Sequence, residues 1–251
     1  MKQMILRGED ITKSFPGCME PVLDHIHLAV YRGDFTIVMG PSGAGKSTLL
    51  YALSGMDVIS EGRVIYKEQE ITRLKEAQMA RLRSREFGFV FQQTHLVSNL
   101  TLFENVAVAG YLNSATSGRK TEERASGLLS QMNVEGARNR MPRQASGGEA
   151  QRAAIARAMI NEPGILFADE PTGALNRRNT DEVLSLLTAL NQKGQSILMV
   201  THDVRAAIRG NRILYLEDGK ILDEMALPSF IPEAAREREE KVSAWLTSLA
   251  W

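Results

Sequence analysis

The sequence predicts an α/β fold with a mainly parallel core sheet, and two observations support this prediction. First, five short apolar runs are typical of buried strands: FTIVM (35–39), FGFVF (87–91), ILFA (165–168), SILMV (196–200) and RILYL (212–216). Second, amphipathic helix patterns such as AQRAAIARAMI and DEVLSLLTALNQ lie between these runs. Continuous apolar strands that alternate with amphipathic helices indicate a parallel sheet covered on both faces.

The first thirty residues depart from this alternation. MILRGEDITKSF and VLDHIHLAVY each alternate in the manner of a strand, and no helix pattern separates them. A strand-type alternation without intervening helices predicts a small antiparallel β-subdomain at the N-terminus.

Two further segments differ from the core. Residues from about 93 to 162 contain helix patterns and polar loops but no convincing strand, which predicts an inserted α-helical subdomain. After a domain of about residues 1–225, the tail 226–251 carries apolar residues at helical i, i+3, i+4 and i+7 spacing: Val242, Trp245, Leu246 and Leu249. This stripe either docks against the chain's own domain or binds a partner.

Composition narrows the class of protein. The chain has 30 basic and 30 acidic residues and a net charge of zero, which argues against a nucleic-acid partner bound through a strong global field. Cys18 is the only cysteine, so no internal disulfide is possible, as suits a reducing cytosol. No signal peptide is expected, and no run of about 18 apolar residues suggests a membrane span. If the chain serves a membrane, we expect it to act through a partner.

A glycine-rich segment after the strand at 35–39 matches the phosphate-binding pattern G-x-x-x-x-G-K-[ST]. Glycines let backbone N–H groups converge on an anion, and the following helix, STLLYALSG, adds the positive end of its dipole. The lysine is expected to reach the β- and γ-phosphates, and the serine hydroxyl is expected to bind Mg²⁺. The predicted triphosphate-binding residues are Gly40, Pro41, Ser42, Gly43, Ala44, Gly45, Lys46, Ser47 and Thr48.

An acidic pair follows the apolar run ILFA. Asp169 and Glu170 are expected at the carboxyl end of a strand, where open α/β sheets bind their ligands. Asp169 is predicted to hold Mg²⁺, and Glu170 to orient or deprotonate an attacking water.

The stretch ASGGEAQRAAIARAM, residues 145–159, predicts a second helix that begins at an anion-binding N-terminus. The acidic residue of the guanine-reading pattern N-K-x-D is missing from NQKG at 191–194, which disfavours a GTPase. Two phosphate-binding helix starts in one chain are explained economically if each nucleotide is shared between two copies.

Taken together, these motifs resemble the nucleotide-binding subunit of an ABC transporter over about residues 3–225, and the resemblance implies a P-loop NTPase cassette. It also implies that Phe15 stacks on adenine and that Gln92 contacts Mg²⁺ and the attacking water. His202 in MVTHD resembles the switch histidine at the γ-phosphate. Ser146, Gly147, Gly148 and Glu149 resemble the signature that binds ATP in trans.

Finer features resemble the branch of lipoprotein-release, macrolide-efflux and antimicrobial-peptide-resistance transporters, among them FADEPTGAL and EFGFVFQQTHLVSNLTLFENV. The resemblance implies an ATP-hydrolysing subunit that pairs as a homodimer and drives a separate integral-membrane permease. It would sit at the cytoplasmic face of a bacterial membrane. The cargo class it implies is antimicrobial peptides, lipopeptides or lipoproteins. The alternatives are a regulatory or mechanical signalling subunit of the division-linked type, and a soluble ABC ATPase without a transport role.

One position departs from the family pattern in a way that bears on function. Asn176 in GALN stands where the family usually has an aspartate at the dimer seam. Asparagine keeps the shape and can accept a hydrogen bond, but it lacks the charge. We therefore expect weaker coupling between the two catalytic sites, with hydrolysis retained.

Overall fold

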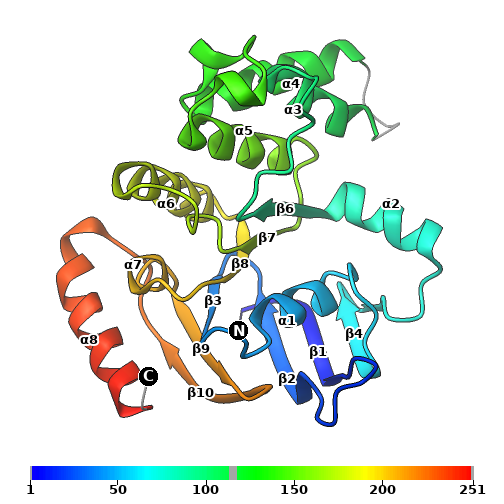
Figure 1. The fold of residues 1–251 in the computed structure, drawn as a ribbon, viewed down its shortest axis with the longest axis vertical. Helices are drawn as coiled ribbons and strands as arrows, with labels where there is room; N and C mark the ends of the chain where they lie inside the picture. Colours follow the sequence, from blue (N-terminus) through cyan, green and yellow to red (C-terminus); the bar gives the residue numbers. More distant parts are fainter. Residues whose placement is uncertain (1, 113–117, 250–251) are drawn as a thin grey trace. The chain divides into compact units, whose positions relative to one another are not determined.

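The computed structural model describes residues 2–112 and 118–249. The chain, which Figure 1 shows coloured from its N-terminus to its C-terminus, divides into two compact units. Unit 1 comprises Met1–Met79 and Leu190–Trp251, and unit 2 comprises Ala80–Ala189.

Unit 1 contains the predicted N-terminal antiparallel sheet. Strand β1 (Met4–Lys13) lies between β2 (Leu23–Tyr31) and β4 (Glu61–Tyr66), and a two-residue strand, β5 (Gln69–Glu70), completes the order β2-β1-β4-β5. All the pairs are antiparallel. The prediction of an antiparallel β-subdomain is confirmed, although the strands β4 and β5 were not predicted.

The core strands of unit 1 lie in the order β10-β9-β3-β8. Strand β3 (Phe35–Met39) is parallel to both β8 (Ser196–Val200) and β9 (Arg212–Glu217). Every residue of β3 and β8 is buried, as their continuous apolar sequences require. Strand β10 (Lys220–Ala226) adds an antiparallel edge through a hairpin.

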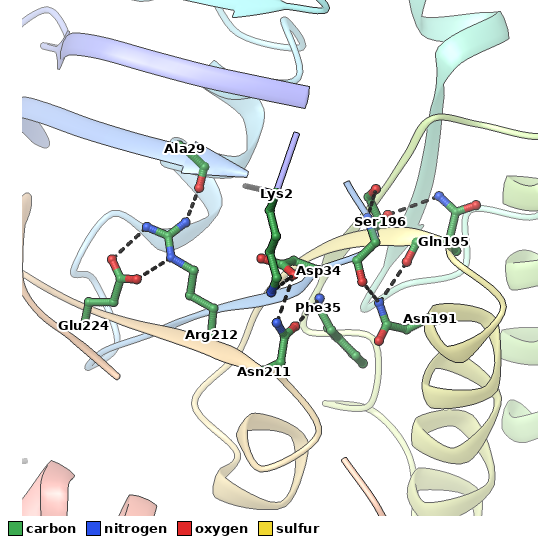
Figure 2. A network of polar contacts seen from close by, with 11 residues as sticks. Lys2, Ala29, Asp34, Phe35, Asn191, Gln195, Ser196, Asn211, Arg212 and Glu224 are labelled. Atoms are coloured by element: carbon green, nitrogen blue, oxygen red, sulfur yellow. Dashed lines mark hydrogen bonds and ion pairs between the residues drawn. The ribbon is translucent and has the colours of Figure 1, made fainter. Parts of the chain in front are cut away.

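Polar side chains anchor the start of β3 (Figure 2). Asp34, only 3% exposed, accepts hydrogen bonds from Lys2 Nζ at 2.6 Å and from Asn211 Nδ2 at 3.0 Å. Asn211 Oδ1 in turn accepts from the backbone N–H of Phe35 at 2.7 Å. Because a buried charge is tolerated only with such partners, this network specifies where β3 begins, and therefore where the glycine-rich loop follows it.

A neighbouring arginine links β9 to two other strands in the same view (Figure 2). The Arg212 guanidinium binds both carboxylate oxygens of Glu224 on β10, and it also donates to the carbonyl of Ala29 on β2. The bidentate arginine–carboxylate pair fixes β10 against β9, and the bond to Ala29 joins β9 to the antiparallel sheet.

Two helices of unit 1 follow core strands directly. Helix α1 (Lys46–Leu53) comes after β3, and the short helix α7 (Val204–Ala207) comes after β8. The tail forms a 3-10 turn (Pro232–Ala234) and helix α8 (Ala235–Ser248), which runs beside α7 (Figure 1).

The tail docks against its own unit. Val242 and Leu246 of the predicted stripe are buried, and Trp245 Nε1 donates to Asp223 Oδ2 at 2.7 Å. The Trp245 ring meets Tyr215 edge to face at 6.4 Å. Intramolecular docking, the first of the two interpretations of the tail, therefore describes this helix. The second tryptophan of the chain, Trp251, lies outside the described residues.

Unit 2 combines two parallel strands with helices. Strand β6 (Phe87–Phe91) pairs in parallel with β7 (Ile165–Asp169). The helices in or entering this unit are α2 (Glu76–Glu86), α3 (Leu102–Tyr111), α4 (Gly118–Gln131), α5 (Gly147–Met159) and α6 (Arg177–Gln192). Two 3-10 turns precede α5, at Glu135–Ala137 and Pro142–Gln144. Helix α3 packs on α4 and α5, and the predicted helical segment 93–162 lies within this unit.

None of the helices in the described parts of the chain combines the length and the apolar character needed to cross a bilayer.

Candidate functional site

The glycine-rich loop has the backbone shape of a phosphate cradle. Gly40, Gly43 and Gly45 have positive φ angles of 154°, 87° and 97°, values that side-chain-bearing residues rarely adopt. A Cβ atom on Gly40 would lie 1.9 Å from the carbonyl oxygen of Leu216 on β9. Only glycine therefore lets the loop leave β3 this close to the neighbouring strand.

Lys46 crosses this loop from the first turn of α1. Its Nζ donates to the carbonyl oxygens of Gly40 and Pro41, each at 2.8 Å, and the residue is only 8% exposed. The residue at the helix start, Gly45, provides no side-chain cap for the first N–H groups of α1. These N–H groups and the adjacent ammonium form a site of positive potential suited to phosphate oxygens.

His202 lies at the same end of the unit 1 sheet as the cradle. Strands β3 and β8 are parallel and in register, with Val38 opposite Val200, and Thr201 N donates to Val38 O at 3.1 Å. The chain therefore reaches Gly40 and His202 just beyond neighbouring strand ends. His202 is exposed, and the next residue, Asp203, caps α7 by accepting from Arg205 N at 2.9 Å.

Phe15 lies in the loop between β1 and β2 and is 39% exposed. The ammonium of Lys13 is 4.7 Å from the centre of its ring, held there by Asp57 Oδ1 at 2.8 Å and Val58 O at 2.6 Å. A cation over an aromatic face restricts the ring and leaves its other face for stacking. Lys13 was not predicted as a site residue, because nothing in the sequence brings residue 13 to residue 57.

The same loop ends beside the phosphate cradle. The carbonyl oxygen of Val22 lies 2.8 Å from the position a Cβ on Gly45 would take. The β1–β2 loop, which carries Phe15, thus borders the cradle in unit 1.

In unit 2 the structure brings together Gln92, Asp169 and Glu170. Phe91 and Asp169 are opposite each other in the parallel β6–β7 pair, so the next residues, Gln92 and Glu170, leave the sheet at the same edge. The Gln92 side chain also packs against Gly173, where a Cβ atom would lie 2.9 Å from Nε2.

Glu170 has an unusual backbone. Its φ angle is +45°, in the left-handed region that glutamate rarely occupies, and its carbonyl accepts from Gly173 N at 3.0 Å. Glu68 and Glu162 have φ angles of 65° and 52° as well, so this angle marks a tight turn and not by itself a functional site. The turn directs Glu170 away from the buried strand that ends at Asp169.

Helix α5 begins with a capping box that the sequence analysis did not predict. Ser146 Oγ accepts from Glu149 N at 3.2 Å, and Glu149 Oε2 accepts from Ser146 N at 2.7 Å. Ser146 Oγ therefore has its acceptor function engaged by the helix, which leaves the hydroxyl hydrogen to be donated elsewhere. The S-x-x-E spacing was the available signal for this cap.

Glu149 is stabilised as a carboxylate. The hydrogen bond from the Ser146 backbone lowers its pKa below the ordinary 4.5, and the Ser146 side chain, Arg140 and Arg152 act in the same direction against burial. Arg140 Nη1 lies 3.1 Å from Glu149 Oε1. Glu149, the acidic residue of the signature, thus stabilises the start of α5 directly.

Asn176 caps the neighbouring helix of unit 2. Its Oδ1 accepts from Asn179 N at 3.0 Å, and its carbonyl accepts from Thr180 N at 2.9 Å, so Asn176 caps α6 immediately before its first residue, Arg177. Asn179 also packs against Gly148, where a Cβ would lie 2.4 Å from Asn179 Oδ1. The start of α6 therefore contacts the start of α5.

An open polar groove of about 990 Å³ adjoins these two helix starts. A buried arginine, Arg152, lines the groove and is paired with Glu182 Oε2 at 2.7 Å. The residues of the groove that were predicted from the sequence are Ser146, Glu149 and Asn176.

Comparison with known proteins identifies the family. The ABC transporter family matches residues 23–173. The lipoprotein-releasing system ATP-binding protein LolD of Aquifex aeolicus (strain VF5) is 42% identical over 221 residues, which are 88% of this chain and 97% of that protein. The macrolide export ATP-binding/permease protein MacB of Vibrio parahaemolyticus is 39% identical over 88% of this chain, which spans about a third (34%) of MacB.

The fold has a solved counterpart at comparable identity. The dimeric ATP-binding cassette MJ0796, in a post-hydrolysis state bound to ADP and Pi, aligns with a TM-score of 0.83 and 36% identity. The alignment covers 90% of this chain and all of that structure. The predicted fold class is confirmed, and so is the predicted branch, since LolD and MacB represent its lipoprotein-release and macrolide-export members. The chain belongs to the ABC transporter family, in which it is an ATP-binding cassette that hydrolyses ATP.

Proposed function

We propose that two copies of the chain pair around ATP at the cytoplasmic face of a bacterial membrane and thereby drive a separate integral-membrane permease. One observation carries the pairing. A single chain has two helix starts suited to phosphate: α1 with its glycine cradle and Lys46, and α5 with the exposed Ser146. The solved structures of MJ0796 are dimeric, which supports the same arrangement here.

The residues present fit a nucleoside triphosphate. Gly40 to Thr48, with Lys46, would hold the phosphates, and Phe15, restrained by Lys13, would stack on adenine. In the partner copy, the Ser146 hydroxyl and the backbone N–H groups of Gly147 and Gly148 would donate to the same nucleotide, and Glu149 would hold the helix start that presents them.

The donor set also fits Mg²⁺ bound together with phosphate. Among the described residues, no three His, Cys, Asp or Glu side chains form a metal cluster. Mg²⁺ that binds together with a nucleotide takes most of its ligands from phosphates and water, so one carboxylate with hydroxyl and amide oxygens can complete its coordination. Ser47, Gln92 and Asp169 would hold it, and the bound ion would neutralise charge that develops on the phosphates.

Glu170 and His202 are the proposed catalytic side chains. Glu170, turned out of β7 by its left-handed backbone, would orient the attacking water and accept its proton. His202, beyond the end of β8, would donate a hydrogen bond to the γ-phosphate, and Gln92 would hold the water at the edge it shares with Glu170.

The proposed cargo is an antimicrobial peptide, lipopeptide or lipoprotein that the permease extracts or exports. Support comes from the similarity to proteins named for lipoprotein release and macrolide export, both across 88% of this chain. A signalling subunit of the division-linked type is the second candidate, because Asn176 lacks the charge of the usual aspartate.

Pairing is tested with Glu170→Gln, which keeps the shape of the side chain but removes the proposed base. Loss of a general base lowers turnover by about 10²–10⁴-fold, so ATP should persist and hold two copies together. Light scattering should give a dimer mass in ATP and Mg²⁺ and a monomer mass in ADP and Mg²⁺. Lys46→Ala, added to Glu170→Gln, should keep the protein monomeric in both.

A Glu170→Gln protein that remains monomeric in ATP, alone and with the membrane protein that co-purifies with it, would refute the pairing. Turnover in lipid nanodiscs with that membrane protein distinguishes the candidate roles. A transport subunit should hydrolyse ATP faster when a lipopeptide or lipoprotein is added. A signalling subunit should not respond to cargo, and a soluble ATPase should not depend on the membrane protein.

A further inference from the structure

Helix α8 carries a buried arginine that has no carboxylate partner in the described contacts. Arg238 is 5% exposed, and its guanidinium donates only to backbone carbonyls: from Nε to Ile208 O at 2.7 Å, from Nη1 to Pro228 O at 2.7 Å, and from Nη2 to Gly210 O. A buried charge is costly unless it is fully hydrogen-bonded, so this geometry tolerates little displacement.

Two of the three acceptors belong to the segment that begins with His202. That segment leaves β8 at Thr201, passes through His202, forms the single turn of α7 and ends at Ile208 and Gly210. The last carbonyls of a helix lack intrahelical partners, and a cation there also interacts favourably with the helix dipole. Arg238 thus holds the C-terminal end of this segment.

The other end of the segment is held as well. Asp203 caps α7 through Arg205 N, and Asp203 N donates to Thr201 Oγ1 at 3.0 Å. Ala206 and Ala207 of α7 are fully buried. His202 is therefore an exposed side chain on a short segment that hydrogen bonds hold at both ends. Arg238, which lies on α8, makes the hydrogen bonds at the C-terminal end.

Helix α8 is itself firmly docked. Val242 and Leu246 are buried in unit 1, and Trp245 is fixed by its hydrogen bond to Asp223 and its contact with Tyr215. Phe230 packs under the guanidinium, with its ring centre 5.6 Å from Arg238 Cζ. The docking of α8 thus fixes the position of Arg238, and the hydrogen bonds of Arg238 in turn hold the end of the α7 segment.

From this geometry we infer that Arg238 is a positioning residue for His202, and that the C-terminal helix braces the catalytic segment of the ATPase. The inference rests on the proposed contact between His202 and the γ-phosphate. Arg238 touches neither the glycine cradle nor Phe15 in any described contact. Its loss should therefore lower the turnover of bound ATP and leave the affinity for ATP unchanged.

The test compares Arg238→Gln with Arg236→Gln in the full chain. Arg236 lies on the same helix, is 93% exposed and pairs only with Glu240 in the described contacts, so it controls for loss of an arginine. We expect kcat to fall about 10- to 100-fold in Arg238→Gln, because small displacements of a catalytic group cost this much. The Kd for ATP and Mg²⁺ should match that of the unmodified chain and of Arg236→Gln.

Histidine NMR supplies a readout that a purely structural role would not move. The chain has four histidines, His25, His27, His95 and His202, so four ring signals can be assigned by single substitutions. Arg238→Gln should shift the His202 signal and leave the other three in place. If Arg238→Gln does not fold, Arg238→Lys keeps the cation but cannot make the three directed bonds, and the same shift is expected.

Two results would overturn the inference while sparing the proposed function: an unmoved His202 signal, or an unchanged kcat, in a folded Arg238 variant. A His202→Ala protein with normal turnover would instead overturn the catalytic assignment of His202, and the inference with it.

Discussion

Ser146 and Glu149 exchange hydrogen bonds across the first turn of α5, with Glu149 Oε2 accepting from Ser146 N at 2.7 Å and Ser146 Oγ accepting from Glu149 N at 3.2 Å. The pair gives the signature helix a defined start. It also engages one acceptor site of the Ser146 hydroxyl, whose hydrogen remains to be donated.

Replacing Glu149 should show how much its capping hydrogen bond contributes to the free energy of unfolding. Glu149→Ala removes the reciprocal bond, and loss of a helix cap costs about 1 kcal/mol of unfolding free energy. Glu149→Gln keeps an acceptor oxygen and should cost less. Urea unfolding at pH 7 measures both values, and equal losses in the two variants would contradict the capping account.

The lowered pKa of Glu149 adds a pH dependence. A carboxyl with a folded pKa below its unfolded value contributes stability above about pH 4.5, and loses it as the pH falls through the folded pKa. The unmodified chain should therefore lose stability in acid faster than Glu149→Gln, whose amide does not titrate. The difference between their unfolding free energies from pH 7 to pH 3 measures this effect; a constant difference would refute it.

Gly40→Ala should disable the phosphate cradle. The new Cβ would lie 1.9 Å from Leu216 O, so the loop or β9 must move, and ATP affinity should fall at least tenfold. Gly194→Ala is the matched control, because Gly194 lies outside the cradle, its Cβ would meet no atom within 4 Å, and only its φ of +96° opposes the change, by about 1–2 kcal/mol. Titration with a fluorescent ATP analogue measures the affinity of both variants, and comparable losses of affinity would contradict the prediction.

Lys13→Met should weaken ATP binding without slowing turnover of bound ATP. Removing the ammonium from the Phe15 ring forfeits a cation–π contact of about 0.5–1 kcal/mol, equivalent to a two- to fivefold higher Kd. Lys67→Met is the control, since Lys67 lies 5.1 Å from the Tyr66 ring, an aromatic residue outside the proposed site. Equal affinities in the two variants would show that Lys13 does not prepare Phe15.

Asn176→Asp should raise the cooperativity of ATP turnover, because it restores the charge that the family usually has at this position. The aspartate can still cap α6, so the fold should be as stable or more stable by about 0.3–1 kcal/mol from the helix dipole. The Hill coefficient and kcat for ATP give the answer. Unchanged values for both would refute the predicted weak coupling.

The elements that could be predicted were those with strong local signals. The strands at 35–39, 87–91 and 196–200 have the bounds expected from their apolar runs, because a strand buried on both faces needs an apolar side chain at nearly every position. Strand β10, with the sequence KILDEMA, was not predicted, since an exposed edge strand imposes no such pattern. The short β5 and the charged helix α2 carry equally weak signals.

The residues of the candidate site likewise include some that local sequence signals predict and some that they do not. Glycine at 40, 43 and 45, lysine at 46 and the acidic pair at 169 and 170 can be identified from the sequence alone, because phosphate binding demands these residue types at fixed spacing in one local segment. The family and its branch followed from the order of such motifs along the chain, and the comparisons confirm both.

Only the tertiary structure decided which distant side chains support those motifs. Lys13 reaches Asp57, Asn179 packs on Gly148, and Arg238 holds Ile208 across 30 residues of sequence. Each of these contacts joins elements that only packing brings together. A hydrogen bond acts over about 3 Å, so its partner is set by where two segments come to lie and not by the spacing of residues along the chain.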